Sequence, residues 1–541
     1  MHTGQQSAWD NNNFSEIYMT KNKPGMSSIA SAVKLMVATV AFGVMGGASA
    51  AADTTRVIVA FKPGSAAAAK SAVAAARGNI KLEIHGMNAM AIEVPTVALK
   101  GLQNNPNIEY VEEDLIRRPF ATTSASTGTP YALGQSVPYG IKQVQADLLP
   151  DTYVANRKIC IIDSGIDRAH ADFIGSTANM TGQYDSGTGN WYTDENSHGT
   201  HVAGTIAAVN NSGGVVGVNA NARVKLHIVK VFSASGWAYS STLASAANQC
   251  GTAGANVISM SLGGGASNTT ESNAFANLQA KGILNIAAAG NDGNTVISYP
   301  AGYSSVMMVG AVDEFKQWAT FSQYNADMEI AAPGVAVLST VPTNTGGESL
   351  LKVGTTSYAP GDITGSPKKV ATAALADFGL GNATSSTVAG KVCLIARGTV
   401  DFATKVMNCQ NSGGVGAVIY NNVAGSFGGT MGTTVASIPS VTASQADGTT
   451  MQGQLGQSAT VTVRTTSYGF KDGTSMATPH VAAVAALVWS YFPTCTGAQI
   501  RSSLNKSAID LGPVGRDVKF GYGLVQAKGA YDRIRQYGCG L

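Results

Sequence analysis

Residues 473–489, GTSMATPHVAAVAALVW, place a serine between small residues at the start of a long apolar run. The run predicts a buried helix, but simple packing needs neither the small residues nor a proline four positions after the serine. A serine at a helix N-terminus lies near free N–H groups, which stabilise negative charge. Pro479 should cost little there, because the first N–H groups of a helix have no intrahelical partner. The stretch therefore predicts a reactive serine, Ser475, that a substrate backbone can approach closely.

Two segments about three hundred residues upstream carry the groups that such a serine needs. Acyl transfer by serine requires a base, a carboxylate that orients the base, and donors for the oxyanion. Asp163 ends the apolar segment KICIIDSG, and His198 begins HGTHVAGT, whose small residues allow close backbone approach. Taken alone, a DSG sequence is usually a turn and a TSM sequence carries no information. Together the three segments indicate a catalytic triad.

Other chemistries fit these residues less well. His198 and His201 could bind a metal, but the glutamate of the H-E-x-x-H pattern is absent and the spacing differs. Ser475 lacks the second glycine of the G-x-S-x-G turn. The order Asp, His, Ser also argues against a lipase or esterase, which runs Ser, Asp, His. A secreted binding protein that keeps the fold without catalysis remains a rival, against which the intact catalytic residues argue.

The sequence around these segments alternates between apolar stretches and stretches of small residues. Continuous apolar strands alternating with helices predict an α/β fold with a mostly parallel sheet covered by helices on both faces. In such sheets the chemistry gathers beyond the carboxyl ends of the strands. The expected strands are KICIIDSG (158–165), VKLHIVKVF (224–232), NVISMSLGG (256–264), ILNIAAAGN (283–291) and VMMVGAV (306–312).

The remainder of the chain divides into further regions. A chain of 541 residues should hold more than one domain. Residues 53–119 predict a small α+β domain, with strands in RVIVAFKPG, AMAIEVP and NIEYVEED and a helix ending at Gly78. The polar stretch 121–135 resembles a linker. Residues 345–465 interrupt the alternating pattern with a strand-helix-strand unit of their own, which indicates an inserted domain.

The N-terminus predicts export. Within residues 1–50, Lys34 precedes the apolar run LMVATVAFGVMGG, which leads into Ala48-Ser49-Ala50, and this order is typical of a secretory signal peptide. The alternative is a buried core helix, and Met26 is a candidate for the true start. The run is short for a membrane span, so we expect a secreted, extracellular protein without a membrane anchor. A net charge of +3 and no basic block give no indication of nucleic-acid binding.

The motifs resemble those of a known family. IIDSGIDRAHADF (161–173), HGTHVAGTIAA (198–208) and GTSMATPHVA (473–482) closely resemble the three signatures of subtilisin-like serine proteases. AAAGND (287–292), which contains Asn291, resembles the segment that supplies the family's oxyanion donor. The resemblance implies a subtilisin-like fold and a serine endopeptidase that forms an acyl-enzyme and hydrolyses peptide bonds in proteins.

The resemblance covers nearly the whole chain and implies its domain organisation. Residues 53–119 resemble an inhibitory propeptide that also aids folding, so the enzyme would be a zymogen that processes itself. Residues 345–465 resemble a protease-associated (PA) insert. The catalytic domain would then comprise 121–344 and 466–541. We expect a monomer whose partners are protein or peptide substrates and its own propeptide.

The resemblance also implies a role for each matching residue. Ser475 would be the nucleophile, His198 the general base and then acid, and Asp163 the residue that holds the imidazole. The side-chain amide of Asn291 and the backbone N–H of Ser475 would receive the oxyanion. The segment that pairs with the substrate backbone and the walls of the S1 pocket would be formed by Ser261, Leu262, Gly263, Gly264, Ala288, Ala289 and Gly290. These small residues predict an open pocket for large apolar P1 side chains, P1 being the residue whose carbonyl is attacked.

A structural calcium site follows from the same resemblance, and no organic cofactor is expected. Three separate segments, QSVPYG, DRAHAD and VNNSGGV, match the family's tight site. The implied ligands are the side chains of Gln135, Asp172 and Asn211 and the carbonyls of Val209, Gly213 and Val215. Six or seven oxygen ligands suit Ca²⁺ better than Mg²⁺. The alternative is that NNSGG is an ordinary surface turn.

Six cysteines depart from the cysteine-free bacterial members of the family. Their number is even and export permits disulfides, but six cysteines allow fifteen connectivities. Cys393 and Cys409 both lie in the insert, and Cys495 and Cys539 bracket the C-terminal part, so local pairing is expected. For the remaining two, a Cys160–Cys250 disulfide is favoured over a free buried thiol at Cys160.

Overall fold

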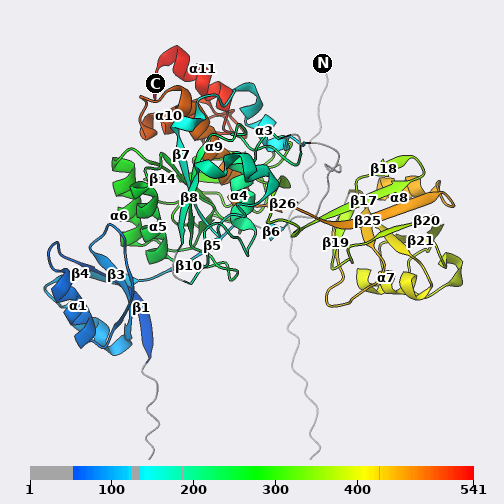
Figure 1. Ribbon diagram of the computed structural model, residues 1–541, viewed down its shortest axis with the longest axis horizontal. Coiled ribbons are helices and arrows are strands. Elements are labelled where there is room, and N and C mark those ends of the chain that lie inside the picture. Colours follow the sequence, from blue (N-terminus) through cyan, green and yellow to red (C-terminus); the bar gives the residue numbers. More distant parts are fainter. Residues whose placement is uncertain (1–52, 121, 124–134, 185–186, 212, 426) are drawn as a thin grey trace, which may run out of the picture. The chain divides into compact units, whose positions relative to one another are not determined.

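The computed structural model describes residues 53–120, 122–123, 135–184, 187–211, 213–425 and 427–541 (Figure 1). The predicted signal peptide lies outside these residues, as does most of the predicted linker. The helices of the described residues include none that is long and apolar enough to cross a membrane. The described chain contains three regions, each with its own sheet and core.

The central region is built on a seven-stranded sheet in which every pair of neighbours is parallel. Its order is β15-β14-β13-β11-β7-β9-β8. These strands span Ile330–Pro333, Val306–Val312, Leu284–Ala288, Val257–Met260, Lys158–Asp163, Lys225–Lys230 and Met180–Tyr184, respectively. The sheet confirms the predicted α/β fold.

Helices cover both faces of this sheet, as the alternating sequence predicted (Figure 1). On β7, Ile159 and Ile161 belong to one buried cluster, and Cys160 and Ile162 belong to another. This separation follows from the period of two along a strand. The first cluster includes α4 (His198–Ala207) and α9 (Thr474–Tyr491). The second includes α5 (Ser240–Thr252) and α6 (Thr269–Ala280).

Helix α9 is almost entirely buried and begins next to Ser475. Our expectation for Pro479 was wrong in one respect, because at the sixth residue of the helix, just past the first turn, a backbone N–H would have an intrahelical partner. The proline therefore removes the N–H that would bond to the carbonyl of Ser475. The hydroxyl of Ser261 donates to that carbonyl instead, at 2.8 Å. A residue 214 positions away thus compensates for the proline.

The N-terminal region is a four-stranded sheet in the order β2-β3-β1-β4, with neighbouring strands antiparallel. Its elements are β1 (Thr54–Phe61), α1 (Ala66–Ala75), β2 (Asn79–Glu83), β3 (Ala89–Pro95), α2 (Leu99–Gln103) and β4 (Ile108–Glu113). The three predicted strands and the helix α1 are present. The strand β2 was not predicted, because its sequence NIKLE has no fully buried residue.

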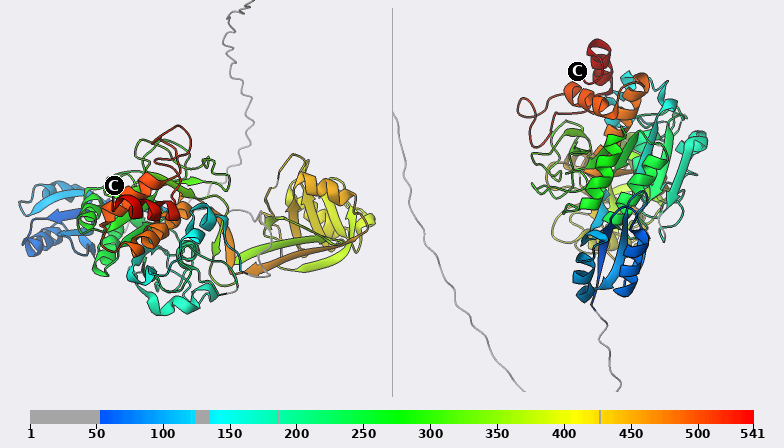
Figure 2. Two further views of the ribbon diagram at one scale, coloured as in Figure 1. Left: turned by 90° about the horizontal axis from the view of Figure 1, so that it is seen from above. Right: turned by 90° about the vertical axis from the view of Figure 1, so that its left-hand side faces the viewer.

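The third region lies between β16 (Val337–Thr340) and β26 (Tyr468–Asp472), two strands that pair with each other. The chain leaves along β17 (Gly346–Val353) and returns along the antiparallel β25 (Ser458–Thr466). Both strands belong to a nine-stranded sheet (Figure 2). The predicted strand-helix-strand unit is β21 (Val392–Ala396), α7 (Phe402–Asn411) and β22 (Gly416–Tyr420).

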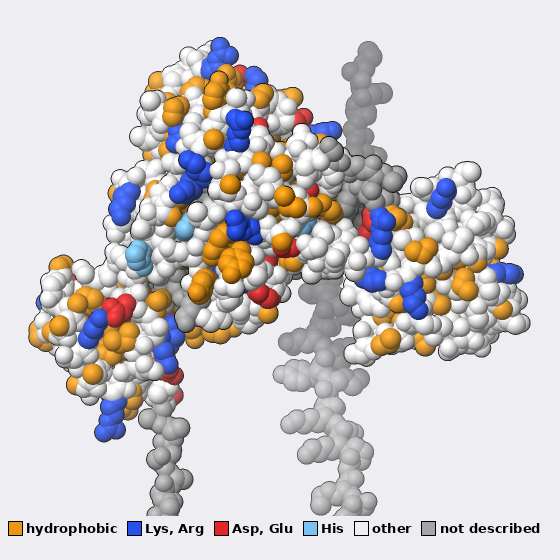
Figure 3. Space-filling model, in the orientation of Figure 1, with side chains coloured by type: hydrophobic (Ala, Val, Ile, Leu, Met, Phe, Trp, Pro, Cys, Tyr) orange, Lys and Arg blue, Asp and Glu red, His pale blue; other side chains and the backbone are white. Residues whose placement is uncertain are grey.

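All six cysteines are paired, with Cys160 bonded to Cys250, Cys393 to Cys409 and Cys495 to Cys539. The three pairings confirm the favoured predictions. The first disulfide joins β7 to α5, so it fixes a helix to the strand that ends in Asp163. On the face drawn in Figure 3, basic and acidic side chains are scattered singly or in small groups, without a continuous basic patch.

Candidate active site

Asp163, His198 and Ser475 come from three different elements and are all buried. Asp163 is the last residue of β7, and His198 is the first residue of α4. The Oδ1 atom of Asp163 accepts a hydrogen bond from His198 Nδ1 at 2.7 Å and another from the N–H of Ser164, also at 2.7 Å. His198 Nε2 has no partner among the described residues. The imidazole is thus held at one nitrogen, and its other nitrogen remains available.

A second carboxylate, Asp194, holds the loop that presents His198. Its Oδ1 accepts hydrogen bonds from the N–H groups of Asn196 and Ser197, and its Oδ2 accepts from the N–H and hydroxyl of Thr200. The hydroxyl of Ser164 also donates to Oδ1, at 2.8 Å. Burial raises the pKa of Asp194, and these hydrogen bonds oppose that rise. Sequence analysis missed Asp194, because a lone aspartate in a polar loop carries no signal.

The nearby His201 has a structural environment. Its Nε2 lies 3.0 Å from the carbonyl of Val337 and 3.1 Å from that of Gly469. Complete burial lowers its pKa well below the usual range, so the ring is neutral. A search of the described residues finds no group of three or more His, Cys, Asp or Glu side chains able to hold a metal.

The backbone of Phe120 lies directly against Ser475. Its carbonyl oxygen accepts hydrogen bonds from Asn291 Nδ2 at 2.9 Å and from the N–H of Ser475 at 3.3 Å. Its N–H faces Ser475 Oγ at 2.9 Å and the carbonyl of Ser261 at 3.3 Å. The hydroxyl of Ser475 donates to the same Ser261 carbonyl at 2.7 Å. Two converging donors on one carbonyl are the arrangement that stabilises a developing oxyanion.

Thr474 fixes the direction in which the Asn291 amide points. Both its N–H and its hydroxyl donate to Asn291 Oδ1, each at 2.9 Å. The NH₂ group of Asn291 is therefore turned toward Phe120. Sequence analysis named Asn291 but missed Thr474, although Thr474 lies within the quoted GTSMA stretch.

The residues before Phe120 form a strand that lies between two strands of the central region. β5 (Ile116–Pro119) is the middle strand of the order β10-β5-β12 and is antiparallel to both neighbours. β12 consists of Leu262–Gly263, and β10 consists of Ala238–Tyr239. The predicted substrate-pairing segment 261–264 is thus brought against a stretch of the chain itself. A Cβ added at Gly264 would lie 2.6 Å from the carbonyl oxygen of Ile116, which shows how closely the two backbones approach.

The ring of Phe120 lies beside Gly263, where an added Cβ would be only 2.5 Å from a ring carbon. Any larger residue at this position would occupy the space of the ring. The other predicted wall residues, Ala288, Ala289 and Gly290, are buried at the end of β13. Gly290 also donates its N–H to Thr474 Oγ1 at 3.1 Å, which links the predicted wall to the helix of Ser475.

Two carboxylates of the N-terminal region bind the N-termini of α5 and α6. Glu112 accepts hydrogen bonds from the N–H groups of Thr269 and Thr270, both at 2.9 Å. Asp114 accepts from the N–H of Ser241 at 3.0 Å and from its hydroxyl at 2.7 Å. Free N–H groups and the helix dipole favour negative charge at these positions. The N-terminal region is therefore held by the same helices that cover the sheet.

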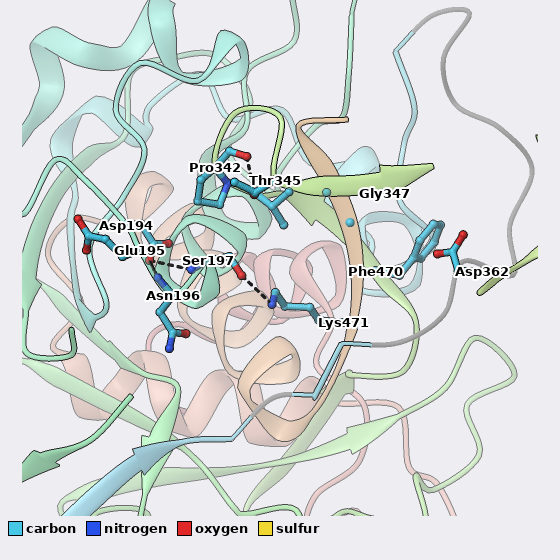
Figure 4. A pocket seen from close by; sticks show the side chains of 13 residues that line it. Asp194, Glu195, Asn196, Ser197, Pro342, Thr345, Gly347, Asp362, Phe470 and Lys471 are labelled. Atoms are coloured by element: carbon cyan, nitrogen blue, oxygen red, sulfur yellow. Dashed lines mark hydrogen bonds between the residues drawn. The ribbon is translucent and has the colours of Figure 1, made fainter. Parts of the chain in front are cut away.

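The chain beyond Phe120 meets a different part of the site. In β6, Thr122 and Thr123 pair with Asp472 and Lys471 of β26. A cavity of about 290 Å³ lies next to β26 (Figure 4). The residues that line this cavity come from the His198 loop, from β26 and from the start of the third region. They are Asp194, Glu195, Asn196, Ser197, Val341, Pro342, Thr345, Gly346, Gly347, Asp362, Gly469, Phe470 and Lys471. Burial lowers the pKa of Lys471, and the Asp194 and Asp163 carboxylates oppose this.

The predicted calcium ligands also come together. The Nε2 atom of Gln135 lies 2.9 Å from the carbonyl of Val209, 3.3 Å from that of Val215 and 3.4 Å from Asn211 Oδ1. Asp172 Oδ1 accepts from Asn211 Nδ2 at 3.1 Å, and its Oδ2 accepts from the N–H of Val215 at 3.0 Å. The carbonyls of Val209 and Val215 and Asn211 Oδ1 thus converge on the Gln135 amide, turning that amide would add a further oxygen, and Asp172 bonds to two of the same residues. The donor set therefore fits a hard cation.

Among the described residues, Gly213 contacts the other predicted ligands through its N–H and not through its carbonyl. Its N–H bonds to Asn211 Oδ1 at 3.2 Å, which holds the loop in place. A parallel bridge between Ser136 and Val215 ties the segment after Gln135 to this loop.

Comparison with known families gives three matches along the chain. Residues 155–374 match the subtilase family, and residues 355–451 match the PA domain. Residues 54–114 match the N-terminal prodomain of fervidolysin. The N-terminal region is thus a prodomain, and the third region contains a PA domain.

Individual proteases resemble the chain over most of their length. Subtilisin amylosacchariticus from Bacillus subtilis subsp. amylosacchariticus is 36% identical over 326 residues, which are 58% of this chain and 80% of that protein. Subtilisin DY from Bacillus licheniformis is 43% identical over 219 residues, which are 39% of this chain and 77% of that protein.

A solved structure shares the fold. The psychrophilic subtilisin-like protease Apa1 from the Antarctic psychrotroph Pseudoalteromonas sp. AS-11 superimposes with a TM-score of 0.62 and 41% identity, covering 75% of this chain and all of that one. The matched domains, the sequence relatives and the shared fold agree with the geometry around Ser475. The chain belongs to the subtilase family and is a serine endopeptidase with a prodomain and a PA domain.

Proposed function

We propose that Asp163, His198 and Ser475 form the catalytic triad of this endopeptidase. His198 Nε2 takes the proton of the Ser475 hydroxyl as Oγ attacks the substrate carbonyl carbon, and Asp163 stabilises the resulting imidazolium. The side-chain NH₂ of Asn291 and the N–H of Ser475 bind the oxyanion. The position of the Phe120 carbonyl carries this proposal, since it lies between those two donors.

The same geometry supports self-processing of the bond between Phe120 and Ala121. Ser475 Oγ attacks the carbonyl carbon of Phe120, the C–N bond breaks, and His198 gives its proton to the amine of Ala121. Water then hydrolyses the acyl-enzyme with His198 again as base. Before the hydroxyl can react it must leave the carbonyl of Ser261 and turn toward His198 Nε2, which has no other partner among the described residues.

The position of Phe120 also supports a preference for large apolar P1 residues. The ring is half-buried beside Gly263, and the predicted wall residues are small. A pocket of this kind gains affinity from apolar area and excludes side chains that would bring an unpaired charge into it. We further propose 121–344 and 466–541 as the catalytic domain, and 345–465 as the insert.

Calcium would be held by the side chains of Gln135, Asp172 and Asn211 and by the carbonyls of Val209, Gly213 and Val215. The ion would supply positive charge that ties the segment after the prodomain to the catalytic domain. Asp172→Ala and chelation of the wild-type enzyme should both shorten the lifetime of the mature enzyme on heating. The assignment fails if chelation leaves the lifetime of the wild-type enzyme unchanged.

Export and release of the mature enzyme complete the proposal. The signal peptide within 1–50 would direct secretion, and self-processing would then leave the prodomain as an inhibitor until it is degraded. We propose that the mature enzyme is a monomer without a membrane anchor.

N-terminal sequencing of the secreted enzyme, together with labelling by a fluorophosphonate, tests the catalytic proposal. We expect a mature N-terminus at Ala121 and a label on Ser475. A label on another residue would overturn the triad, and an N-terminus elsewhere would overturn the Phe120 site alone.

A further inference from the structure

Arg117 is fully buried although it is an arginine on a strand that lies in the substrate groove. Its side chain is 1% exposed, whereas that of the next residue, Arg118, is exposed. Its Nε and Nη2 atoms donate to the two carboxylate oxygens of Glu271, at 3.0 and 2.7 Å. Nη2 also donates to the carbonyl of Ala266 at 3.0 Å. The pair is bidentate, the geometry in which arginine binds a carboxylate most strongly.

Glu271 is also held by contacts that do not involve Arg117. It lies in the first turn of α6, where its N–H bonds to Asn268 Oδ1 at 3.0 Å. The hydroxyl of Tyr303 donates to Oε2 at 2.8 Å. With Arg117 in place, the Glu271 side chain is completely buried. Burial of a carboxylate costs free energy unless the charge is paired, so a cationic side chain is favoured beside Glu271.

The register of the strand assigns Arg117 to a defined subsite. Phe120 occupies P1, because its carbonyl lies between Asn291 and the N–H of Ser475. Counting back, Arg117 occupies P4, the third residue before P1. The β5–β12 pairing of Leu262 with Pro119 agrees with this register. The wall of the P4 site includes Gly264, where an added Cβ would be 3.2 Å from Arg117 Nη1.

The site belongs to the catalytic domain, so it remains when the prodomain leaves. Glu271, Tyr303, Ala266 and Gly264 all lie after residue 121 in the sequence. After cleavage, the carboxylate keeps its one bond from the Tyr303 hydroxyl and loses both donors of the guanidinium. A substrate strand in the same register would place its own P4 side chain against Glu271.

We propose that the S4 subsite of the mature enzyme selects arginine through Glu271. This inference rests on the proposed function, and it names the class of substrate, namely peptides with arginine three residues before a large apolar P1 residue. Arginine is favoured over lysine, because two N–H donors in a fixed plane match the two oxygens of Glu271. The neighbouring P3 side chain, Arg118, is exposed and has no carboxylate partner within the described part of the chain, so it should matter little.

Four chromogenic anilides test the proposal with the mature enzyme obtained from the full chain. The parent peptide is Ile-Arg-Arg-Pro-Phe, and the others carry lysine at P4, alanine at P4 or alanine at P3. We expect the P4 alanine peptide to lose at least about 30-fold in kcat/KM, since the loss of one partner leaves a buried charge unpaired. The P3 alanine peptide, as the matched control, should stay within about threefold of the parent.

The variant Glu271→Gln identifies the residue responsible. The ratio of kcat/KM for the P4 arginine and P4 alanine peptides should fall at least about tenfold in this variant. Because the ratio is measured in one preparation, partial misfolding does not change it. If the variant does not fold, the wild-type ratio decides alone.

A wild-type ratio below about threefold would overturn the proposal, and an unchanged ratio in Glu271→Gln would overturn the role of that residue. Failure of the proposed function looks different. In that case neither P4 peptide is cleaved and the fluorophosphonate does not label Ser475.

Discussion

Phe120 and Arg117 lie three residues apart on one segment, yet the enzyme holds them by different means. Phe120 is bound through its backbone, by donors at its carbonyl, and through a ring that lies beside Gly263. Arg117 is bound through its side chain, by a buried carboxylate. Any residue can offer a carbonyl, whereas a guanidinium belongs to one residue type. The difference indicates that catalysis and recognition are separable along the bound strand.

Removal of the nucleophile should have the largest effect, because it should stop cleavage after Phe120 without disturbing the contacts of Arg117. Ser475→Ala should abolish cleavage of the bond after Phe120, because the same hydroxyl attacks every substrate, while the Arg117–Glu271 pair remains. Mass spectrometry of the purified protein should show the prodomain still attached. Ser490→Ala, a buried serine near the end of the same helix, should process normally. Accumulation of a mature N-terminus at Ala121 in Ser475→Ala would refute self-processing.

Loss of an oxyanion donor should act on the rate and leave binding at the Arg117 end intact. Asn291→Ala should reduce kcat by about 10²–10³-fold with little change in KM, which is the size of effect known for the corresponding donor in subtilisin, a relative of this chain. Thr474→Val should cost less, because only one of its two bonds to Asn291 is lost. Steady-state kinetics on the Ile-Arg-Arg-Pro-Phe anilide give both constants. A change confined to KM would mean that Asn291 binds the ground state.

A charge at Phe120 tests whether the P1 pocket is as selective as the P4 site. In the precursor, Phe120→Asp should slow self-processing by about 100-fold, because the apolar pocket offers the carboxylate no partner. Phe120→Leu should process within a few-fold of the wild-type rate, since it keeps most of the apolar area. The rate is followed by the appearance of the mature band on gels. Equal rates for the two variants would show that the P1 position is not discriminated.

Acidic pH should lower the stability of the fold through buried histidines such as His480, and it should leave the Arg117–Glu271 pair unchanged. Burial lowers the pKa of His480, which follows Ser475 on α9, from 6.5 to about 4. Between these values the unfolded chain binds more protons than the folded one, so stability is complete above pH 6.5 and decreases as the pH falls toward 4. At pH 5 the expected contribution of His480 to the loss is about 2 kcal/mol in the free energy of unfolding.

Denaturant unfolding of Ser475→Ala, which cannot digest itself, measures this loss. Adding His480→Gln should reduce the difference between pH 7 and pH 5 by about 2 kcal/mol and leave the part that belongs to the buried His201, whereas changing the exposed His85 to Gln should not reduce it. Adding Glu271→Gln should also leave the difference unchanged. If Glu271→Gln removed this difference in stability, the acid sensitivity would belong to the Arg117–Glu271 pair and not to the buried histidine.

The candidate catalytic residues and the class of fold could be predicted from the sequence. Asp163, His198, Ser475 and Asn291 could be named because each lies in a local pattern that can be recognised without knowing what it contacts. The alternation of apolar strands and helices predicted the parallel sheet, because the burial of both faces leaves a local signal in every strand. The favoured disulfides were also predicted, and all three are present.

The contacts of these residues could not be predicted from the sequence and became known from the fold. Arg117 and Glu271 are 154 positions apart, and Ser261 and Ser475 are 214 positions apart. Neither Glu271 nor Asp194 stands in a distinctive sequence, and Pro479 was misjudged because its compensating hydroxyl comes from another strand. Such pairs are fixed by the register of strands and the packing of helices, which one sequence does not encode locally. The substrate preference that we infer at P4 therefore became visible only when the prodomain strand was seen in the groove.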